Sequence, residues 1–235
     1  MRRAVTIAIV VTIATIACLA AGWRPLAAQD LQPPFPRTNA TKVLETDRIV
    51  VWDIVWPKGQ PTAMHRHVYD QVGTYYVTGG RLITTPDGVS RSATTPVGAL
   101  STTRKGTTHI EEGATDPPLR AVFIELKKDA GSGQPENASG TMPVFAGGAK
   151  PLLDDERVVV WDYTWTPGAP AASSRYTRDT IVVWLAPGTL RLTPEGGTTA
   201  TVDVAPGQIR RYTRGASETA EAVTGSPRAM IFAFK

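Results

Sequence analysis

Three histidines are the residues best able to do chemistry in this chain of 235 residues. His65 and His67 are separated by one residue, and His109 lies further along the chain. Side chains two positions apart on a β-strand point to the same face, so a strand here would present two imidazoles together. Two imidazoles on one face form half of a site for a divalent metal ion. The competing interpretation is an accidental pair on an exposed strand.

Other catalytic groups are scarce. The sole cysteine is Cys18, close to the N-terminus, so the rest of the chain has no disulfide, no thiolate nucleophile and no cysteine-based metal site. The sequence contains no Gly-x-Ser-x-Gly elbow, and any histidine base would have to come from the three already named, which argues against a serine hydrolase. The chemistry must therefore use histidines, carboxylates, amides or hydroxyls.

The charge of the chain argues against a nucleic-acid partner. The formal net charge is +4, but Arg2, Arg3 and Arg24 lie in the first 28 residues, which contain no acidic residue. Without that segment the chain has 22 of its 25 basic residues and 21 acidic residues, so the charges nearly balance. The remaining charges form no block of one sign. We therefore expect neither DNA nor RNA to bind.

The leading segment is typical of a signal peptide. A cationic start is followed by an uncharged apolar stretch from Ala4 to Gly22 and by small residues that would allow cleavage after Ala28. Residues 1–28 are thus predicted to be a signal peptide, and the protein to be secreted or periplasmic. If the signal is not cleaved it would serve as a membrane anchor, which is the only membrane contact that we expect.

The chain repeats itself. Residues 44–56 and 153–165 align at an offset of 109 with seven identities in thirteen positions, including two tryptophans in phase. Both copies consist of short runs rich in Val, Ile, Thr, Tyr and Trp, bounded by turn signals, and no helical period persists after residue 30. Such strands hide their edges by closing into a barrel or sandwich, so the fold class is predicted to be all-β.

The repeats divide the chain into parts. Residues 29–39 contain three prolines and are predicted to form an extended N-terminal arm. Residues 40–128 make up the first domain and residues 148–235 the second. Residues 129–147 are mostly small, polar and turn-forming, which is typical of a linker.

Two blocks of residues carry a family resemblance. One reads Gly-x5-His-x-His-x3-Gln from Gly59 to Gln71, and the other reads Gly-x5-Arg-x-Gly-x2-His from Gly98 to His109. This spacing resembles the two motifs of the cupin superfamily, in which all three histidines would be metal ligands. The resemblance implies two tandem cupin-type β-barrels, each a double-stranded β-helix or jelly roll, and thus a bicupin. Gln71 stands where the family has a glutamate, so we expect a weak fourth metal ligand or a hydrogen-bond donor there.

The second copy lacks the metal-site motif. At the same offset, the positions of the three histidines hold Ser174, Tyr176 and Glu218, and that of Gln71 holds Thr180. One carboxylate, one phenol and two hydroxyls do not make a plausible site for a first-row metal. The C-terminal domain is therefore predicted to be a degenerate cupin with a role in packing, binding or dimerisation, and a homodimer is one option.

The donor set indicates the kind of substrate. Neutral imidazoles and an amide leave a divalent ion with its full charge, which attracts an anion. We therefore expect a small anionic or enolic substrate. The resemblance implies Fe(II) first, in a mononuclear metal-dependent oxygenase, with Zn, Mn, Ni or Cu as alternatives. The rival hypothesis is a non-catalytic cupin that binds a small molecule or metal in the cell envelope.

Strand parity suggests the neighbours of the metal. Gln71, Gly73 and Tyr75 would share one face with the histidines. Gly73 is predicted to leave space for a substrate, and Gln71 and Tyr75 are the candidate catalytic residues that could hydrogen-bond it. A Tyr75 that only fills the barrel is the other interpretation. Glu111 has the parity of His109 and could be its partner, but a solvated charge at a strand end is the prediction.

Overall fold

The computed structural model describes residues 31–127 and 150–235 as β-strands joined by turns and loops, with no helix in either range. The all-β prediction is confirmed. Across these two ranges no helix has the length and apolar character needed to cross a membrane. The predicted signal peptide and the predicted linker both lie outside the described residues.

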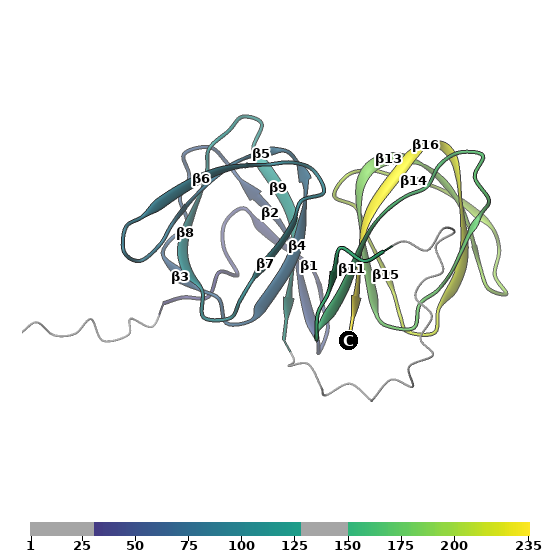
Figure 1. Ribbon diagram of the computed structural model, residues 1–235, viewed down its shortest axis with the longest axis horizontal. Coiled ribbons are helices and arrows are strands. Elements are labelled where there is room, and N and C mark those ends of the chain that lie inside the picture. The colour runs from purple at the N-terminus through teal and green to yellow at the C-terminus, as the bar shows by residue number, and fades with distance from the viewer. Residues whose placement is uncertain (1–30, 128–149) are drawn as a thin grey trace, which may run out of the picture. The chain divides into compact units, whose positions relative to one another are not determined.

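Residues 40–126 form the N-terminal barrel. Its two antiparallel sheets have the strand orders β1-β2-β9-β4-β7 and β3-β8-β5-β6. In Figure 1, β3, β6 and β8 form one side of this barrel, and β2, β4 and β9 form the opposite side. The strands are β1 (Ala40–Glu45), β2 (Ile49–Trp56), β3 (His65–Arg66), β4 (Asp70–Val77), β5 (Gly79–Thr84), β6 (Ser90–Thr95), β7 (Leu100–Thr103), β8 (Thr108–Gly113) and β9 (Leu119–Leu126).

Alternation along β2 explains how the barrel closes. Its even-numbered residues, Trp52, Ile54 and Trp56 among them, belong to one buried cluster with Phe123, while Ile49 and Val51 belong to another. Trp52 lies opposite Phe123 in the register between β2 and β9. Because both faces of β2 are buried, its apolar residues are nearly continuous, as expected for a central strand.

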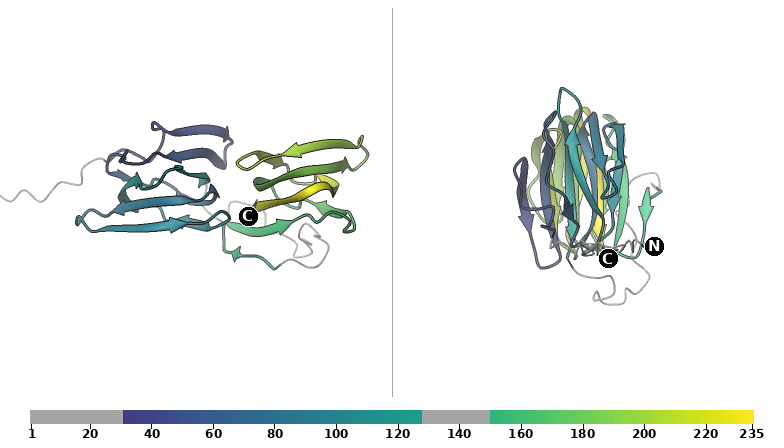
Figure 2. Two further views of the ribbon diagram at one scale, coloured as in Figure 1. Left: turned by 90° about the horizontal axis from the view of Figure 1, so that it is seen from above. Right: turned by 90° about the vertical axis from the view of Figure 1, so that its left-hand side faces the viewer.

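Residues 153–234 form the C-terminal barrel, which Figure 2 shows from two further directions. Its sheet has the order β10-β11-β16-β13-β14, with β12 paired to β16 and β15 paired to β13. Trp161 faces Ile231 across β11 and β16, as Trp52 faces Phe123 in the first barrel, so the arrangement is consistent with a duplication. The strands are β10 (Leu153–Asp154), β11 (Val158–Thr164), β12 (Ala172–Arg175), β13 (Thr180–Pro194), β14 (Ala200–Val204), β15 (Ile209–Tyr212) and β16 (Ser217–Phe234).

The two barrels share one apolar cluster. It contains Val72 and Ile124 from the first barrel together with Val160 and Phe232 from the second. Beside it, Arg157 donates to Asp70 at 2.9 Å. Packing is thus one role of the C-terminal barrel.

The N-terminal arm is fixed to the first barrel. The ring of Phe35 stacks on Trp52 with centroids 4.6 Å apart. The backbone N–H of Arg66 donates to the carbonyl of Gln32 at 3.1 Å, and Val55 N–H donates to Asn39 at 2.8 Å. These contacts place the arm beside β2 and β3, and the first histidine lies on β3.

Candidate metal centre

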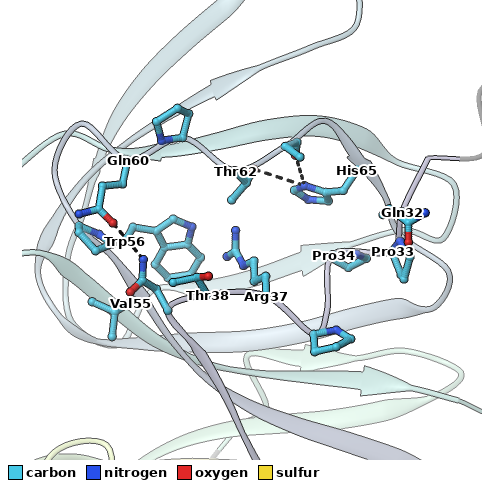
Figure 3. A pocket seen from close by; sticks show the side chains of 15 residues that line it. Gln32, Pro33, Pro34, Arg37, Thr38, Val55, Trp56, Gln60, Thr62 and His65 are labelled. Atoms are coloured by element: carbon cyan, nitrogen blue, oxygen red, sulfur yellow. Dashed lines mark hydrogen bonds between the residues drawn. The ribbon is translucent and has the colours of Figure 1, made fainter.

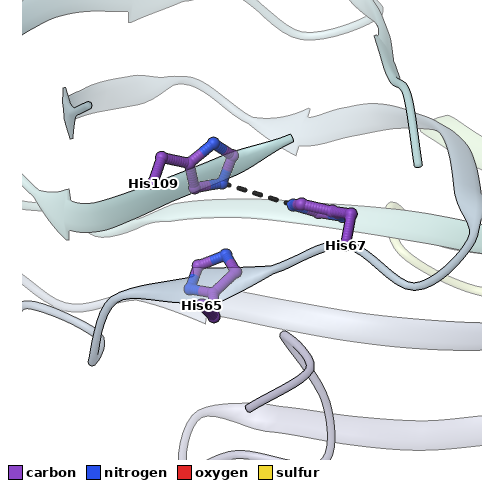
Figure 4. Close-up of side chains that lie close together, drawn as sticks. All are labelled: His65, His67 and His109. Atoms are coloured by element: carbon purple, nitrogen blue, oxygen red, sulfur yellow. Dashed lines mark hydrogen bonds between the residues drawn. The ribbon is translucent and has the colours of Figure 1, made fainter. Parts of the chain in front are cut away.

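The structure brings the three histidines together inside the N-terminal barrel. His65 lies on β3 and pairs in register with His109 on β8, and His67 follows β3 directly. One nitrogen from each ring lies within 4.8 Å of the others, and Nε2 of His67 is 3.3 Å from Nε2 of His109. Figure 4 shows the rings turned toward one another. The pair does not lie on an exposed strand, because all three side chains are buried.

Their hydrogen bonds and protonation suit metal binding. Nδ1 of His65 lies 3.0 Å from the carbonyl of Ala63, while its Nε2 is buried and has no hydrogen-bond partner among the described residues. A backbone carbonyl on Nδ1 is the usual way in which a histidine ligand is oriented. Burial lowers the pKa of His67 and of His109 to about 4, so both rings are neutral at pH 7. The three imidazoles could together hold one divalent metal ion.

Glu111 is a buried neighbour of the histidines. It is 6% exposed, and its Oε1 lies 3.6 Å from Nε2 of His109. It accepts hydrogen bonds from Trp56 at 3.0 Å, Arg37 at 3.0 Å and Arg81 at 2.5 Å. Burial alone would raise its pKa, but the two arginines outweigh burial and hold the pKa at about 2. The prediction of a solvated strand-end charge is therefore wrong, because the arm and β5 supply two cations that cover the carboxylate.

These three residues form a charged unit, which we call the arginine–glutamate triad: Arg37, Glu111 and Arg81. Two guanidinium groups and one carboxylate leave a net charge of one positive unit. The second amino group of Arg81 donates to the hydroxyl of Tyr75 at 2.8 Å, and its guanidinium lies 4.9 Å from the centre of the Trp56 ring. The barrel interior next to the histidines is therefore cationic.

Gln71, Tyr75 and Gly73 are the other residues that the sequence predicts at the site. Gln71 lies on β4, is 4% exposed, and its amide nitrogen has no hydrogen-bond partner in the described part of the chain. Its role as a fourth ligand stays a prediction. Tyr75 is tied to Arg81. The prediction of open space at Gly73 is wrong, because a Cβ there would lie 1.8 Å from Cδ1 of Phe123, whose ring fills that space.

In the second barrel, the residues at the histidine positions bond to each other and to their neighbours. Glu218 accepts a hydrogen bond from the hydroxyl of Tyr212 and another from Arg210 at 3.3 Å. The rings of Tyr176 and Tyr212 stack with centroids 3.9 Å apart. Ser174 and Thr180 are buried in the same barrel. These groups form an aromatic and hydroxyl-rich interior with a single carboxylate, unlike the histidine cluster.

Sequence reasoning missed both arginines of the triad. Arg81 stands two residues after Gly79 on β5, and its register position opposite Gly113 puts it beside the residues that follow His109. Alternation along β5 was the signal that could have found it. Arg37 lies in a stretch with no period, so no local pattern indicates that it reaches Glu111, 74 positions away.

Solved structures share this architecture. A cupin domain from Bordetella pertussis Tohama I is 30% identical over 40% of this chain and 99% of that domain, with a TM-score of 0.36. A cupin 2 conserved barrel domain protein from Leptotrichia buccalis is 13% identical over 83% of this chain and 88% of that one, with a TM-score of 0.56. An oxalate decarboxylase from Bacillus subtilis is 13% identical over 83% and 72%, with a TM-score of 0.54.

The last two likenesses concern the fold alone, since their identities are low. The sequence matches no protein-family model and no curated protein. The strand order and the converging histidines nevertheless agree with the motifs read from the sequence. The chain belongs to the cupin superfamily.

Proposed function

We propose that this protein is a secreted or periplasmic bicupin that binds one divalent metal ion through His65, His67 and His109 and acts as a mononuclear metal-dependent oxygenase on a small anionic or enolic substrate. The observation that carries the proposal is the cluster of three buried ligand nitrogens within 4.8 Å of one another. Fe(II) bound there would supply oxygen activation, whereas Zn(II) or Ni(II) would supply Lewis-acid chemistry.

The residues around the cluster support an anionic substrate. Neutral imidazoles do not reduce the charge of a bound cation, and the nearest carboxylate, Glu111, is already paired with two arginines. A buried site that combines these charges attracts anions strongly. Tyr75, held by Arg81, and the free amide of Gln71 are the groups proposed to orient the bound anion.

Metal analysis of the purified protein tests the first half of the proposal. We expect about one ion per chain. His65→Ala removes a ligand and should abolish binding, while Ser174→Ala alters the equivalent position of the second barrel and should leave the metal content unchanged. Equal metal contents for the two variants would contradict the assignment of the site.

Oxygen uptake tests the second half. The protein would be loaded with Fe(II) under anaerobic conditions and then screened with β-diketones, flavonols, small thiol acids and oxalate. Turnover of one class would support the oxygenase, and its loss in His65→Ala would tie it to the cluster. A metal-loaded protein that is silent across the panel would favour a non-catalytic binding protein of the cell envelope.

Export is tested separately. N-terminal sequencing of the protein recovered from the periplasm or the medium should begin at Gln29 if cleavage follows Ala28. A protein that stays with the membrane fraction and retains its first residues would indicate an anchor.

A further inference from the structure

A pocket lies between the N-terminal arm and the first barrel. Its volume is about 320 Å³, within the range of roughly 300 to 1,000 Å³ that is usual for small-molecule sites. We call it the arm pocket; its walls include Pro34, Arg37, Trp56, Thr62 and His65. Figure 3 shows the side chain of Arg37 extending between Trp56 and His65. The pocket and the histidine cluster therefore share His65.

The pocket wall carries one kind of charge. None of its lining residues is acidic, and Arg37 is the only Lys or Arg among them. The one carboxylate that Arg37 contacts, Glu111, is shared with Arg81, so the triad keeps one uncompensated positive charge. A guanidinium has five N–H donors in a planar fork. The hydrogen bond from Arg37 to Glu111 uses Nη2, and the Arg37 side chain keeps 14% of its surface exposed.

These features favour a singly charged carboxylate as the ligand of the arm pocket. A buried charge that is only partly compensated is costly, and a bound carboxylate would relieve this cost through paired hydrogen bonds. A single uncompensated charge matches a monoanion better than a dianion such as phosphate. The rest of the wall is rich in proline, so it suits an apolar body.

We propose that the arm pocket binds a small organic monocarboxylate, whose carboxylate accepts hydrogen bonds from Arg37 and whose apolar body lies along the prolines of the arm. Its role as the substrate site rests on the proposed function, because His65 would connect this pocket to the metal centre. Arg37 is then a specificity-determining residue contributed by the arm.

Benzoate and its neutral analogue benzamide test the proposal in the metal-free full-length protein, by calorimetric titration. Benzoate should bind at least tenfold more tightly than benzamide, because only benzoate carries the charge that Arg37 recognises. Equal affinities, or no binding of either compound, would overturn the proposal. This comparison needs no variant and so does not depend on any variant folding.

Variants then assign the binding to Arg37. Arg37→Gln should weaken benzoate about tenfold to a hundredfold and leave benzamide unchanged, and Arg37→Lys should retain part of the preference for the anion. Arg91→Gln is the matched control, since Arg91 is exposed on β6 and is not part of the arm pocket. A loss of benzoate binding in Arg91→Gln as large as in Arg37→Gln would contradict the assignment.

Metal loading separates the two proposals. A protein that prefers benzoate but binds no metal would refute the proposed function and leave the arm pocket in place. A protein that binds one metal ion through the histidines but does not distinguish benzoate from benzamide would refute the arm pocket alone.

Discussion

Two buried glutamates of the first barrel offer a matched test of the arginine–glutamate triad. Glu111 and Glu125 each accept a hydrogen bond from a tryptophan indole, at 3.0 Å from Trp56 and 2.8 Å from Trp52. Only Glu111 is also bonded to arginines. Burial raises the pKa of Glu125, whereas the arginines overcome burial at Glu111. We therefore expect Glu111→Gln to be far more destabilising than Glu125→Gln.

The expected loss of stability in Glu111→Gln follows from the pKa of Glu111. A value of about 2 in place of the ordinary 4.5 corresponds to about 3 kcal/mol of stability at pH 7, at ~1.36 kcal/mol for each pH unit. Removing one partner from a buried ion pair costs a similar amount, about 3 to 5 kcal/mol. Glu125→Gln removes a carboxylate whose ionised form burial disfavours, so its cost at pH 7 should be under ~1 kcal/mol.

The two carboxylates also differ in their dependence on pH. The contribution of Glu111 is present above pH 4.5 and is lost as the pH falls toward 2, so the cost of Glu111→Gln should shrink to about 1 kcal/mol at pH 3. The raised pKa of Glu125 gives the opposite dependence on pH. Its ionisation lowers the free energy of unfolding, and this cost grows as the pH rises toward and through the pKa of Glu125 in the folded protein. Urea unfolding followed by tryptophan fluorescence at pH 7 and pH 3 measures both differences. Equal losses for the two variants, or a loss for Glu111→Gln that does not change with pH, would refute the reasoning.

Three further predictions concern the barrel interior. Burial lowers the pKa of His67 and His109 to about 4, so the metal-free protein should lose stability as the pH falls below 6.5. The loss for one such ring should reach about 3 kcal/mol at pH 4, and thermal unfolding across this pH range measures the loss. Gly73→Ala should cost at least ~3 kcal/mol in urea unfolding, because its Cβ would meet Phe123, and a near-neutral result would contradict the close contact. Thr74→Val should be neutral or stabilising by up to ~1 kcal/mol, since the fully buried hydroxyl has no partner among the described residues; a large loss would reveal a bond to water.

Some of the fold and of the site was predictable because the signals are local or periodic. The run of β-branched and aromatic residues along Ile49–Trp56 indicates a strand from eight residues alone. The spacing of His65, His67 and His109 places three ligand-capable side chains, and the register between β3 and β8 sets two of them opposite each other. For Ile49–Trp56 and for the pair His65 and His67, the sequence pattern and the backbone geometry act over the same short range, whereas His109, 42 positions from His67, was connected to them by the family motif.

The remainder depended on contacts that no local pattern encodes. Glu111 looks like a strand-end charge until Arg81, 30 positions away, and Arg37, 74 positions away, are brought to it. Gly73 looks like open space until Phe123 from another strand is packed against it. Whether a polar or small residue faces water or a partner is decided by the closed barrel, not by its neighbours in the chain.

The attachment of the arm sets an order on folding. Phe35 and Arg37 leave the ribosome before the rest of the barrel, yet the indole that Phe35 stacks on lies in β2 and the carboxylate that Arg37 bonds lies in β8. Phe35 can therefore stack early, but the contact of Arg37 with Glu111 must wait until nearly the whole first barrel has been synthesised. Protection of the arm from a protease during refolding should report the completion of the barrel rather than its onset.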